Sequence, residues 1–507
     1  MEINMKNILF TLTLIIFTAL PSLAQLQGQA KIDSLLKELP YAKGDTNHVN
    51  LLKNLSYYYS YTNPDKGIEY GEEALYLSQE LKWKQGIAYS YNSLGVNNQK
   101  KGDFIKVMQY YKDALKINEE LGNRNRTAIN LGNIGIAYAI QSNFPKALEY
   151  YVKAIKIDEE LGNKNGVARH LGNIGIVYQE QSDYAKALEY YLKALEINDE
   201  LGNKNGVANN LGNIGNIYRN KSNYAKSLEY LNKALKLNEE LENKSWVADN
   251  LGNIGSTYNL QLDYPKAIEY YKNAIKINEE LGQKNGLAIN LVNVGMIYSL
   301  QSNYPKAFEY YEKSLNIFED LNNKYGIAMN LGNIGALHLK YTQDTVSHNL
   351  KEMKEYVSID KEININKAIQ SSKEAISIFE DISELKNRSG FLGSLAEAYR
   401  EKGDYKNADK YYQESVKLKD SVFNQENTKK IEALTDERDR IEADKIAEKE
   451  ARIAAENKSQ RNRLQYLGIG AVVVAFGVLL LLSGRMKLSE WVARALVPLS
   501  SSLNSSL

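Results

Sequence analysis

The sequence predicts an all-α protein, in which a solenoid of about nine helical hairpins precedes a charged helix and one transmembrane helix. Three observations support this prediction. Closely similar phrases return with a period of 40 residues between Asn130 and Gly335. Within each repeat, apolar residues recur with the spacing of amphipathic helices. Residues 464–483 form an uncharged run of 20 residues, long enough for a helix to cross a bilayer.

Composition excludes several functional classes. The chain has 507 residues, 43% of them hydrophobic, which is enough to bury a large core. Its formal net charge is +1, and no long basic run is interleaved with aromatic residues, so nucleic acid is not an expected partner. Cysteine is absent, which excludes disulfides, thiolate metal sites and cysteine nucleophiles.

The first 24 residues have the layout of a secretory signal peptide. Lys6 precedes an apolar run over residues 8–20, and small residues follow, with cleavage expected after Ala24. The apolar run is short for a membrane-spanning helix, although an uncleaved anchor is the alternative. We expect an N-terminal helix over residues 25–48 and then the solenoid over residues 49–422.

Each repeat consists of two helical phrases. The first reads NLGNIGIAY at 130–138, HLGNIGIVY at 170–178, NLGNIGNIY at 210–218 and NLGNIGSTY at 250–258, and similar phrases begin at Asn290 and Asn330. The second reads, for example, YAKALEYYLKALEINDELGNKNG at 184–206. Because both phrases have helical periodicity, the predicted unit is a helical hairpin.

Residues at the phrase ends agree with this unit. Asn143 and Asp183 offer capping oxygens before the second helix, and Pro145 falls in its first turn, where the missing N–H costs little. Gly162 and Gly202 follow that helix, where a left-handed residue often ends a helix. The phrases are therefore bounded by suitable start and stop signals.

These phrases resemble the tetratricopeptide repeat. The large–large–glycine–tyrosine signature of that family falls on Leu131, Ile134, Gly135 and Tyr138, and its small–aromatic–small signature on Ala147, Tyr151 and Ala154. The resemblance implies a right-handed superhelix whose first helices line a concave, partner-binding face. The usual period of the family is about 34 residues with a terminal proline, so this chain resembles the longer-repeat variety. We expect Gly135 and its equivalents to let two helix backbones approach closely.

The repeat register extends outward to nine units. The position of Gly135 falls on Leu55 in the first unit and on Ala396 in the last, and both units depart from the consensus as terminal caps do. The eighth unit contains an insertion at about 341–361, which we expect to form a protruding loop or a short added helix.

The sequence gives little support for catalysis, and we expect neither enzyme activity, nor a cofactor, nor a metal. The four histidines are scattered and match no metal or catalytic spacing. Paired glutamates such as Glu119 and Glu120 lie at helix ends beside lysines, where solvation explains them. His170 replaces an asparagine of the neighbouring repeats, and we expect it at a polar position of the groove.

A series of asparagines is the sharpest binding signal. It consists of Asn133, Asn173, Asn213, Asn253, Asn293 and Asn333, two residues before each repeat glycine. Residues one helical turn away vary from repeat to repeat. We expect six of them to line the groove as well, namely Arg169, Asn209, Asn216, Asp249, Ile289 and Met296. The resemblance implies that such amides hold the backbone of an extended peptide, since each offers a donor and an acceptor. The alternative is that each asparagine bonds an adjacent helix and only stabilises stacking.

Residues 423–463 are rich in alternating charges, which favours a helix. Its apolar stripe is interrupted, so a coiled coil that forms a homodimer is one interpretation and a stiff stalk is another. A helix that transmits a signal to the membrane is a third. The predicted transmembrane helix at 464–483 and a short tail at 484–507 follow, and the tail suggests truncation or a frameshifted remnant.

Export and anchoring together predict a single-pass protein of the bacterial inner membrane, with its repeats on the periplasmic side. Two functions remain open. The chain is either a scaffold that binds a peptide or protein partner in its groove, or the sensor portion of a transmembrane signalling receptor whose output domain is missing. The second layout resembles the sensor half of bacterial repeat-containing signalling proteins, whose output is a histidine kinase, a cyclase or a DNA-binding domain.

Overall fold

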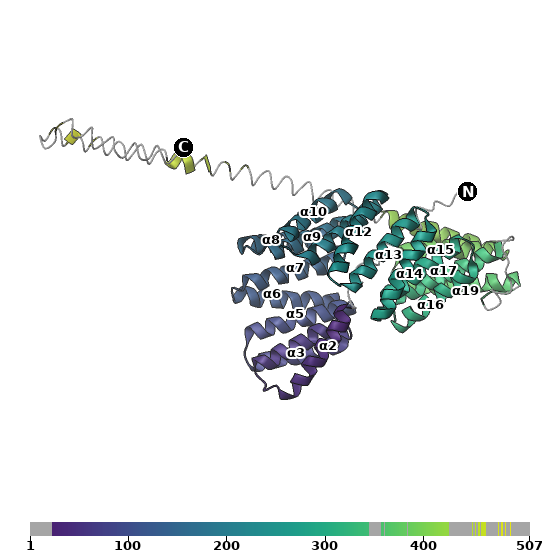
Figure 1. The fold of residues 1–507 in the computed structure, drawn as a ribbon, viewed down its shortest axis with the longest axis horizontal. Coiled ribbons are helices and arrows are strands. Elements are labelled where there is room, and N and C mark those ends of the chain that lie inside the picture. The colour runs from purple at the N-terminus through teal and green to yellow at the C-terminus, as the bar shows by residue number, and fades with distance from the viewer. Residues whose placement is uncertain are drawn as a thin grey trace. The chain divides into compact units, whose positions relative to one another are not determined.

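The computed structural model describes residues 23–343, 356–358, 360–382 and 384–424, with isolated residues between 449 and 487. Residues 1–428 form one compact unit, and residues 429–507 form another. In the first unit the described elements are helices, arranged as successive antiparallel pairs (Figure 1). The all-α stack of helical hairpins predicted from the sequence is confirmed.

Nine hairpins follow one another in the described part of the chain, after α2 (Leu23–Glu38) and the short 3-10 helix η2 (Leu39–Tyr41). They are α3 (Thr46–Tyr59) with α4 (Pro64–Glu80), α5 (Lys84–Lys101) with α6 (Phe104–Glu120), α7 (Arg124–Ile140) with α8 (Phe144–Glu160), α9 (Lys164–Glu180) with α10 (Tyr184–Glu200), α11 (Lys204–Asn220) with α12 (Tyr224–Glu240), α13 (Lys244–Leu260) with α14 (Tyr264–Leu281), α15 (Lys284–Leu300) with α16 (Tyr304–Asp320), α17 (Lys324–Gln343) with α19 (Lys361–Asp381), and α20 (Leu385–Glu401) with a helix over residues 405–424. In the first eight of these hairpins, each second helix packs against its own first helix and against the first helix of the next hairpin.

The predicted caps are present. Asn143 Oδ1 accepts a hydrogen bond from the Lys146 backbone N–H at 3.4 Å, and Asp183 Oδ1 accepts one from Lys186 at 3.1 Å. Gly162 follows the second helix with a φ of 66°, in the left-handed region that favours glycine. These local signals fix where each helix begins and ends, and thereby the length of the hairpin.

In five of the described hairpins, a buried tyrosine of the second helix packs against a glycine of the first, whereas in α12 the residue is Leu231. An added Cβ on Gly135 would lie 2.7 Å from Tyr151 Cε1, and one on Gly175 would lie 2.7 Å from Tyr191 Cδ1. Tyr151 and Tyr191 are at most 2% exposed. The prediction of close backbone approach is therefore wrong at these two positions, because the space that each glycine leaves is filled by an aromatic ring.

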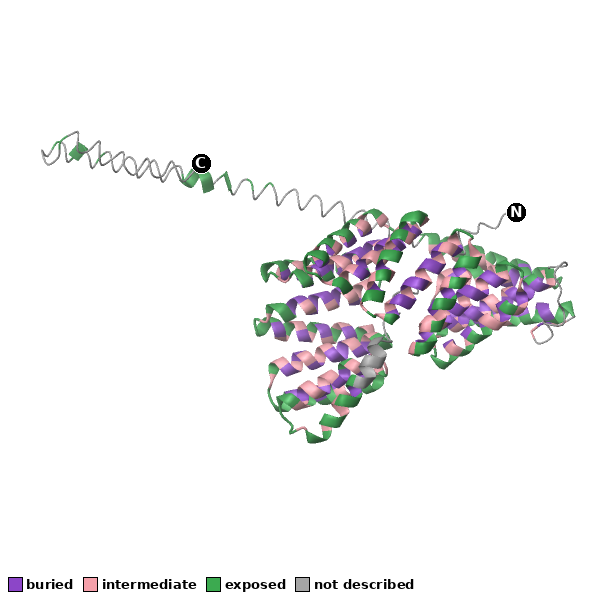
Figure 2. Ribbon diagram, in the orientation of Figure 1, coloured by how far each residue is buried: buried purple, intermediate pink, exposed green. Residues whose placement is uncertain are grey.

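Burial follows the helix faces that meet neighbouring helices, and exposed residues gather at the turns (Figure 2). A further pair of tyrosine rings lies nearer the surface in most of the described hairpins, as where the rings of Tyr178 and Tyr190 lie 5.4 Å apart. Lys186 and Lys193 each place an ammonium group over one of these rings, at 5.1 and 5.3 Å from the ring centres. Aromatic contacts therefore reinforce the outer edge of these hairpins.

The insertion in the eighth hairpin is partly described. Helix α17 continues to Gln343, and residues 344–355 lie outside the described ranges. Beyond them, the Tyr356 ring stacks on Phe308 of α16 at 5.3 Å, and Val357 is 7% exposed. Asn364 Nδ2 donates a hydrogen bond to Ser358 O at 2.6 Å. The end of the insertion is therefore held against the stack.

Most of the predicted flanking segments lie outside the described residues. This applies to the signal peptide up to residue 22, to nearly all of the charged helix at 423–463, to most of the transmembrane segment at 464–483, and to the tail at 484–507. Within the ranges that are described, no helix combines the length and the apolar composition needed to cross a bilayer.

Candidate peptide-binding surface

The two asparagines of the NLGNIG phrase occupy different environments. The first of them is 0 to 7% exposed in five first helices, at Asn130, Asn210, Asn250, Asn290 and Asn330. Asn210 Nδ2 donates to Gly206 O one turn earlier at 2.8 Å, and Asn130 Nδ2 donates to Asn92 Oδ1 of α5 at 2.7 Å. This buried series serves the fold, and the sequence analysis did not distinguish it.

The predicted series lies three residues later and is more accessible. Five of its members are half-buried, namely Asn133, Asn173, Asn213, Asn253 and Asn333, whereas Asn293 is 4% exposed. Asn213 Nδ2 donates to Asn209 Oδ1 of its own helix at 3.0 Å, and Asn133 Nδ2 lies 3.5 Å from Asn92 Oδ1 on α5. Members of the series thus differ in their hydrogen bonding, since Asn213 bonds within its own helix and Asn133 lies close to a neighbouring helix.

The variable neighbours differ in exposure. Arg169 and Asn209 are exposed, and Asp249, Ile289 and Met296 are half-buried. Asn216 is 6% exposed, and its Oδ1 has no hydrogen-bond partner. Of the further groove residues, Asn216 is therefore the one that the fold buries.

Arg219 is a residue of this surface that the sequence analysis missed. It lies near the end of α11, is 6% exposed, and donates from Nη1 to Asn253 Oδ1 at 3.1 Å and to Asn253 O at 3.5 Å. Burial lowers the pKa of Arg219 to about 10, so the guanidinium remains charged at neutral pH. The sequence did contain a signal for Arg219. It occupies the repeat position that glutamine holds in two other hairpins, at Gln99 and Gln179.

Asp249 lies one helical turn before Asn253 on α13. Burial raises the pKa of the Asp249 carboxyl to about 7, and burial is the sole cause of this shift. Asp249 therefore changes charge near neutral pH at the predicted surface.

His170 does not occupy the expected polar groove position. It is 1% exposed, lies 3.3 Å from Asp158 Oδ2 through Nε2, and fills the space beside Gly132. Burial lowers the pKa of His170 to about 4, with a smaller contribution from Arg169, and burial raises that of Asp158. The pair occupies the position that a buried asparagine pair takes between α6 and α7, where Asn118 Nδ2 donates to Asn130 Oδ1 at 2.8 Å. His170 belongs to the interior of the stack.

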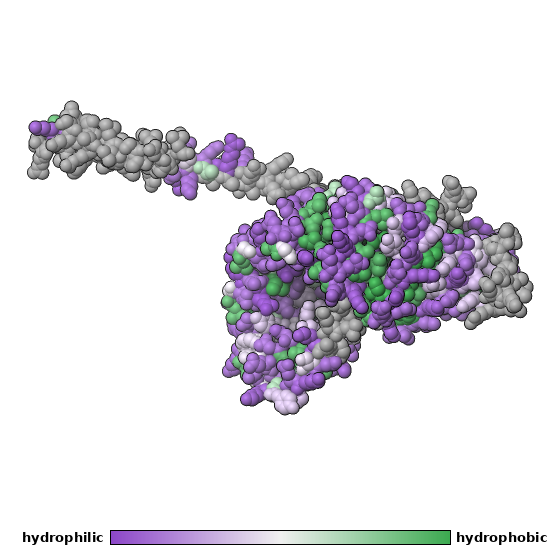
Figure 3. Space-filling view, viewed as in Figure 1, coloured by the Kyte–Doolittle hydropathy of each residue, from purple (hydrophilic) through white to green (hydrophobic). Residues whose placement is uncertain are grey.

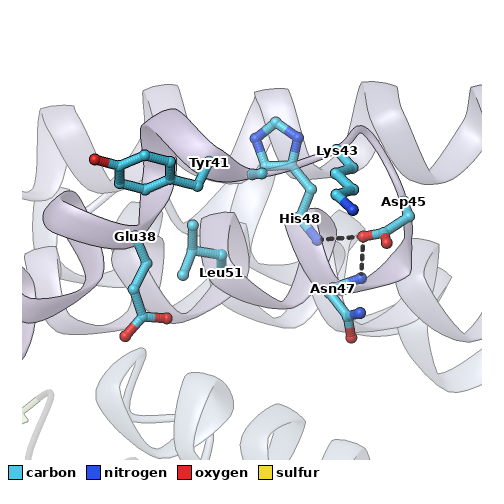
Figure 4. Close-up of a pocket in the computed structure, with 8 residues that line it drawn as sticks. Glu38, Tyr41, Lys43, Asp45, Asn47, His48 and Leu51 are labelled. Atoms are coloured by element: carbon cyan, nitrogen blue, oxygen red, sulfur yellow. Dashed lines mark hydrogen bonds between the residues drawn. The ribbon is translucent and has the colours of Figure 1, made fainter.

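A concave pocket of about 350 Å³ lies elsewhere, at the first turns of the solenoid (Figure 4). Tyr41, Lys43 and His48 are among the residues that line it, and none of the asparagines of the predicted series does. Asp45 Oδ1 accepts hydrogen bonds there from the backbone N–H groups of Asn47 and His48 at 2.9 and 3.1 Å. These bonds cap α3, so the Asp45 carboxylate serves the fold.

Hydrophilic side chains predominate on one face of the molecule. Figure 3 shows a face that is mostly hydrophilic and crossed by narrow apolar strips. Across the described ranges, no group of three or more histidine, cysteine, aspartate or glutamate side chains could hold a metal ion. The chemistry of the predicted surface is therefore that of amides with a few charged side chains, which suits hydrogen bonding to a polypeptide.

Comparison with solved structures gives matches at low identity. They include a signal transduction ATPase with a tetratricopeptide repeat sensor from Pyrococcus horikoshii, at 17% identity and a TM-score of 0.49, covering 71% of this chain and 54% of that one. Aspartyl phosphate phosphatase F from Bacillus subtilis matches at 16% identity and a TM-score of 0.46, covering 74% and 94%. The quorum sensor NprR from B. thuringiensis matches at 16% identity and a TM-score of 0.44, covering 77% and 98%.

Comparison with curated proteins by sequence finds no match. Family models do match parts of the chain. A tetratricopeptide repeat model matches residues 126–200 and 206–280, a second one matches residues 390–421, and a Sel1 repeat model matches residues 293–316. These matches show that the chain contains tetratricopeptide repeats, in agreement with its repeated hairpin and glycine–tyrosine packing.

Proposed function

We propose that this protein is a membrane-anchored scaffold that binds an extended peptide or a segment of a partner protein along its first helices, without catalysing a reaction. The observation that carries this proposal is the division between the two asparagines of each phrase. Asn210 is buried and bonded to its own helix, whereas Asn213 and Asn253 are half-buried in successive first helices. These half-buried amides recur in successive repeats although they are not part of the buried core. A role in the core therefore does not explain why asparagine recurs there.

A row of amides suits the backbone of a peptide because each side chain can donate to a carbonyl and accept from an N–H group. The residues around the row vary, as with Arg169 on α9, Asn209 on α11 and Ile289 on α15. Constant amides would hold the main chain of the guest, and the variable neighbours would select its side chains. The alternative role in stacking is supported at two positions, where Asn133 approaches Asn92 and where Asn253 accepts a hydrogen bond from Arg219, each on the preceding first helix.

The membrane anchor and the location rest on the sequence. The predicted signal peptide at 1–24 and the uncharged run at 464–483 support a single-pass protein of the bacterial inner membrane, with the repeats on the periplasmic side. The charged segment at 423–463, between the repeats and that run, favours a second candidate function. In this second function, the chain is the sensor portion of a transmembrane signalling receptor, and the charged segment transmits a change in the repeats to the membrane.

The groove is tested by Asn173→Ala combined with Asn213→Ala, because both are half-buried and the side chain of Asn253 also holds the buried Arg219. The full chain in detergent is presented with a random peptide library, and the affinity of the best selected peptide is compared between variants. Loss of two peptide hydrogen bonds predicts binding weaker by about tenfold, with little change in the unfolding midpoint.

The matched control is Asn232→Ala combined with Asn273→Ala, because both asparagines are exposed on second helices. We expect this control to bind the selected peptide as the wild type does. Equal affinity of the first variant and the wild type would exclude a binding role for the row. A loss of stability in the first variant would instead favour the stacking role.

A further inference from the structure

The helix over residues 405–424, which ends the described stack, exposes a row of apolar side chains. The row consists of Tyr405, Tyr412, Val416 and Phe423, which are 71, 51, 36 and 62% exposed. Their spacing in the sequence places all four within about 40° of one line along the helix, over a length of about 27 Å. We call this row the terminal stripe.

Inner hairpins bury the equivalent positions under the next hairpin. The stacked tyrosine rings of the last hairpin align it with the hairpin of α9 and α10. In this alignment Tyr412 corresponds to Tyr191, which is 0% exposed and shares a core cluster with Ile214 of α11. Tyr405 corresponds to Tyr184, which packs against the same cluster. A following first helix therefore covers, within the stack, the kind of surface that the terminal stripe leaves open.

The sequence of the last hairpin also turns the stripe outward. Ala396 occupies the position that corresponds to Gly175 of α9. Because a Cβ on Gly175 would lie 2.7 Å from the ring of Tyr191, the ring of Tyr412 cannot take the equivalent place beside Ala396. Phe423 lies beyond the point that corresponds to the end of α10, so the longer last helix adds a further apolar residue.

The opposite end of the described stack is closed by the chain itself. Ile32 of α2 is 0% exposed and packs with Leu55 and Tyr59 of α3. Helix α2 thus takes the place against α3 that the second helix of a preceding hairpin takes against every later first helix. Head-to-tail stacking of copies is therefore blocked at this end, which leaves pairing of like ends.

The continuation of the chain is not suited to cover the stripe. A segment that returned over Tyr405 must reverse direction after Asn424, as the chain does before this helix at Gly403, where φ is 82°. Residues 425–463 contain neither glycine nor proline, the residues that most often form turns. The sequence therefore offers no turn signal that would bring this segment back.

We propose that the terminal stripe is a dimer interface, at which two copies of this chain pair stripe to stripe. Such an interface is isologous, so the apolar row of one copy covers the same row of the other. Four side chains from each copy make a small contact, which is weak between dilute chains. Two copies anchored in one membrane are held at a raised effective concentration and with these helices parallel, and this part rests on the anchor of the proposed function.

The test uses cysteine cross-linking, since the chain has no cysteine of its own. Val416→Cys and a matched control, Ser421→Cys, are each made in the full chain, reconstituted into phosphatidylcholine vesicles and oxidised. Both residues are exposed on the same helix, but Ser421 points about 140° away from Val416. We expect Val416→Cys to form a disulfide-linked dimer and the control to form about tenfold less, because a disulfide requires Cα atoms within about 7 Å.

A second measurement asks whether the stripe itself drives the pairing. Tyr412→Lys is added to Val416→Cys, so that two like charges meet across the interface, and we expect cross-linking to fall by about tenfold. Ser421→Lys added to Val416→Cys is the control, and we expect its cross-linking to be unchanged. Since Tyr412 and Ser421 are exposed, we expect both variants to keep the thermal midpoint of the parent, as followed by circular dichroism.

If Val416→Cys cross-links no more than the control, a mixture of Tyr405→Cys and Phe423→Cys chains is oxidised. Cross-linking in this mixture shows antiparallel helices, which supports the interface and rejects the shared membrane orientation. If neither experiment gives a dimer, the proposal is rejected, and the rate of maleimide labelling of Val416→Cys shows whether the chain itself covers the stripe. Cross-linking that persists with Tyr412→Lys also rejects it. Peptide binding by the first helices is measured separately, so either proposal can fail alone.

Discussion

The glycines of a first helix offer a measurable test of how the hairpins pack. Gly175 and Gly172 lie three residues apart inside α9, but their surroundings differ. An added Cβ on Gly175 would lie 2.7 Å from Cδ1 and Cε1 of Tyr191, a ring that is 0% exposed. An added Cβ on Gly172 would meet only Asn210 Oδ1, at 3.9 Å. The two positions share a helix and differ in available space.

Changing either glycine to alanine gains about 1 kcal/mol of helix propensity. At Gly172 this gain stands, so Gly172→Ala is expected to stabilise the protein by about 0.5–1 kcal/mol. At Gly175 the methyl group must displace a buried ring, which costs about 1–3 kcal/mol. The propensity term cancels between the two variants, and Gly175→Ala is therefore expected to be less stable than Gly172→Ala by about 1–3 kcal/mol.

The assay is urea denaturation of both variants, followed by circular dichroism and compared through the midpoint and the slope. Repeat proteins can unfold in parts, so an unchanged slope is required before the midpoints are compared. If Gly175→Ala were as stable as Gly172→Ala, the ring of Tyr191 would not be confined by the glycine. The packing account of the repeat would then fail.

Two further predictions concern pH. In the folded protein the pKa of His170 is lowered to about 4, against an ordinary value of 6.5. As the pH falls, the imidazole of the unfolded chain therefore takes up a proton before that of the folded chain. The protein accordingly loses stability between about pH 6.5 and 4. His170→Asn is therefore expected to lose less stability than the wild type when urea midpoints at pH 7 and pH 4.5 are compared, and an equal loss would contradict the burial of this imidazole. Asp249 has a pKa of about 7 and gains negative charge above it, so fluorescence anisotropy should show an acidic peptide binding more weakly at pH 8 than at pH 6. Asp249→Asn is expected to remove that pH dependence, and its persistence would show that Asp249 does not face the ligand.

Much of the fold was predictable because its signals are local. Helix periodicity, the capping residues Asn143 and Asp183, and the left-handed Gly162 act within a few residues of each other, and the sequence displays them directly. The number of hairpins followed from the repeat register. Local signals therefore sufficed for the architecture of the described stack.

The site was less predictable because it depends on contacts between repeats. Asn210 and Asn213 are both polar and lie in the same phrase, yet one is buried and the other half-buried, which depends on how α11 meets its neighbours. His170 was expected in the groove because the equivalent residue of the neighbouring repeats is an asparagine, as at Asn130 and Asn210. Those asparagines are themselves buried, so this repeat position lies inside the stack. Arg219 was missed because its partner Asn253 lies 34 residues away, at a different register position.

The pair of Arg219 and Leu231 shows that one repeat can change its chemistry while the adjoining repeats keep theirs. The hairpins of α9 with α10 and of α13 with α14 retain their buried tyrosines on either side of the altered unit. Two substitutions in such a scaffold therefore suffice to place a buried charge within one hairpin. A designer could vary recognition in this way one hairpin at a time, with the spacing of the rungs left intact.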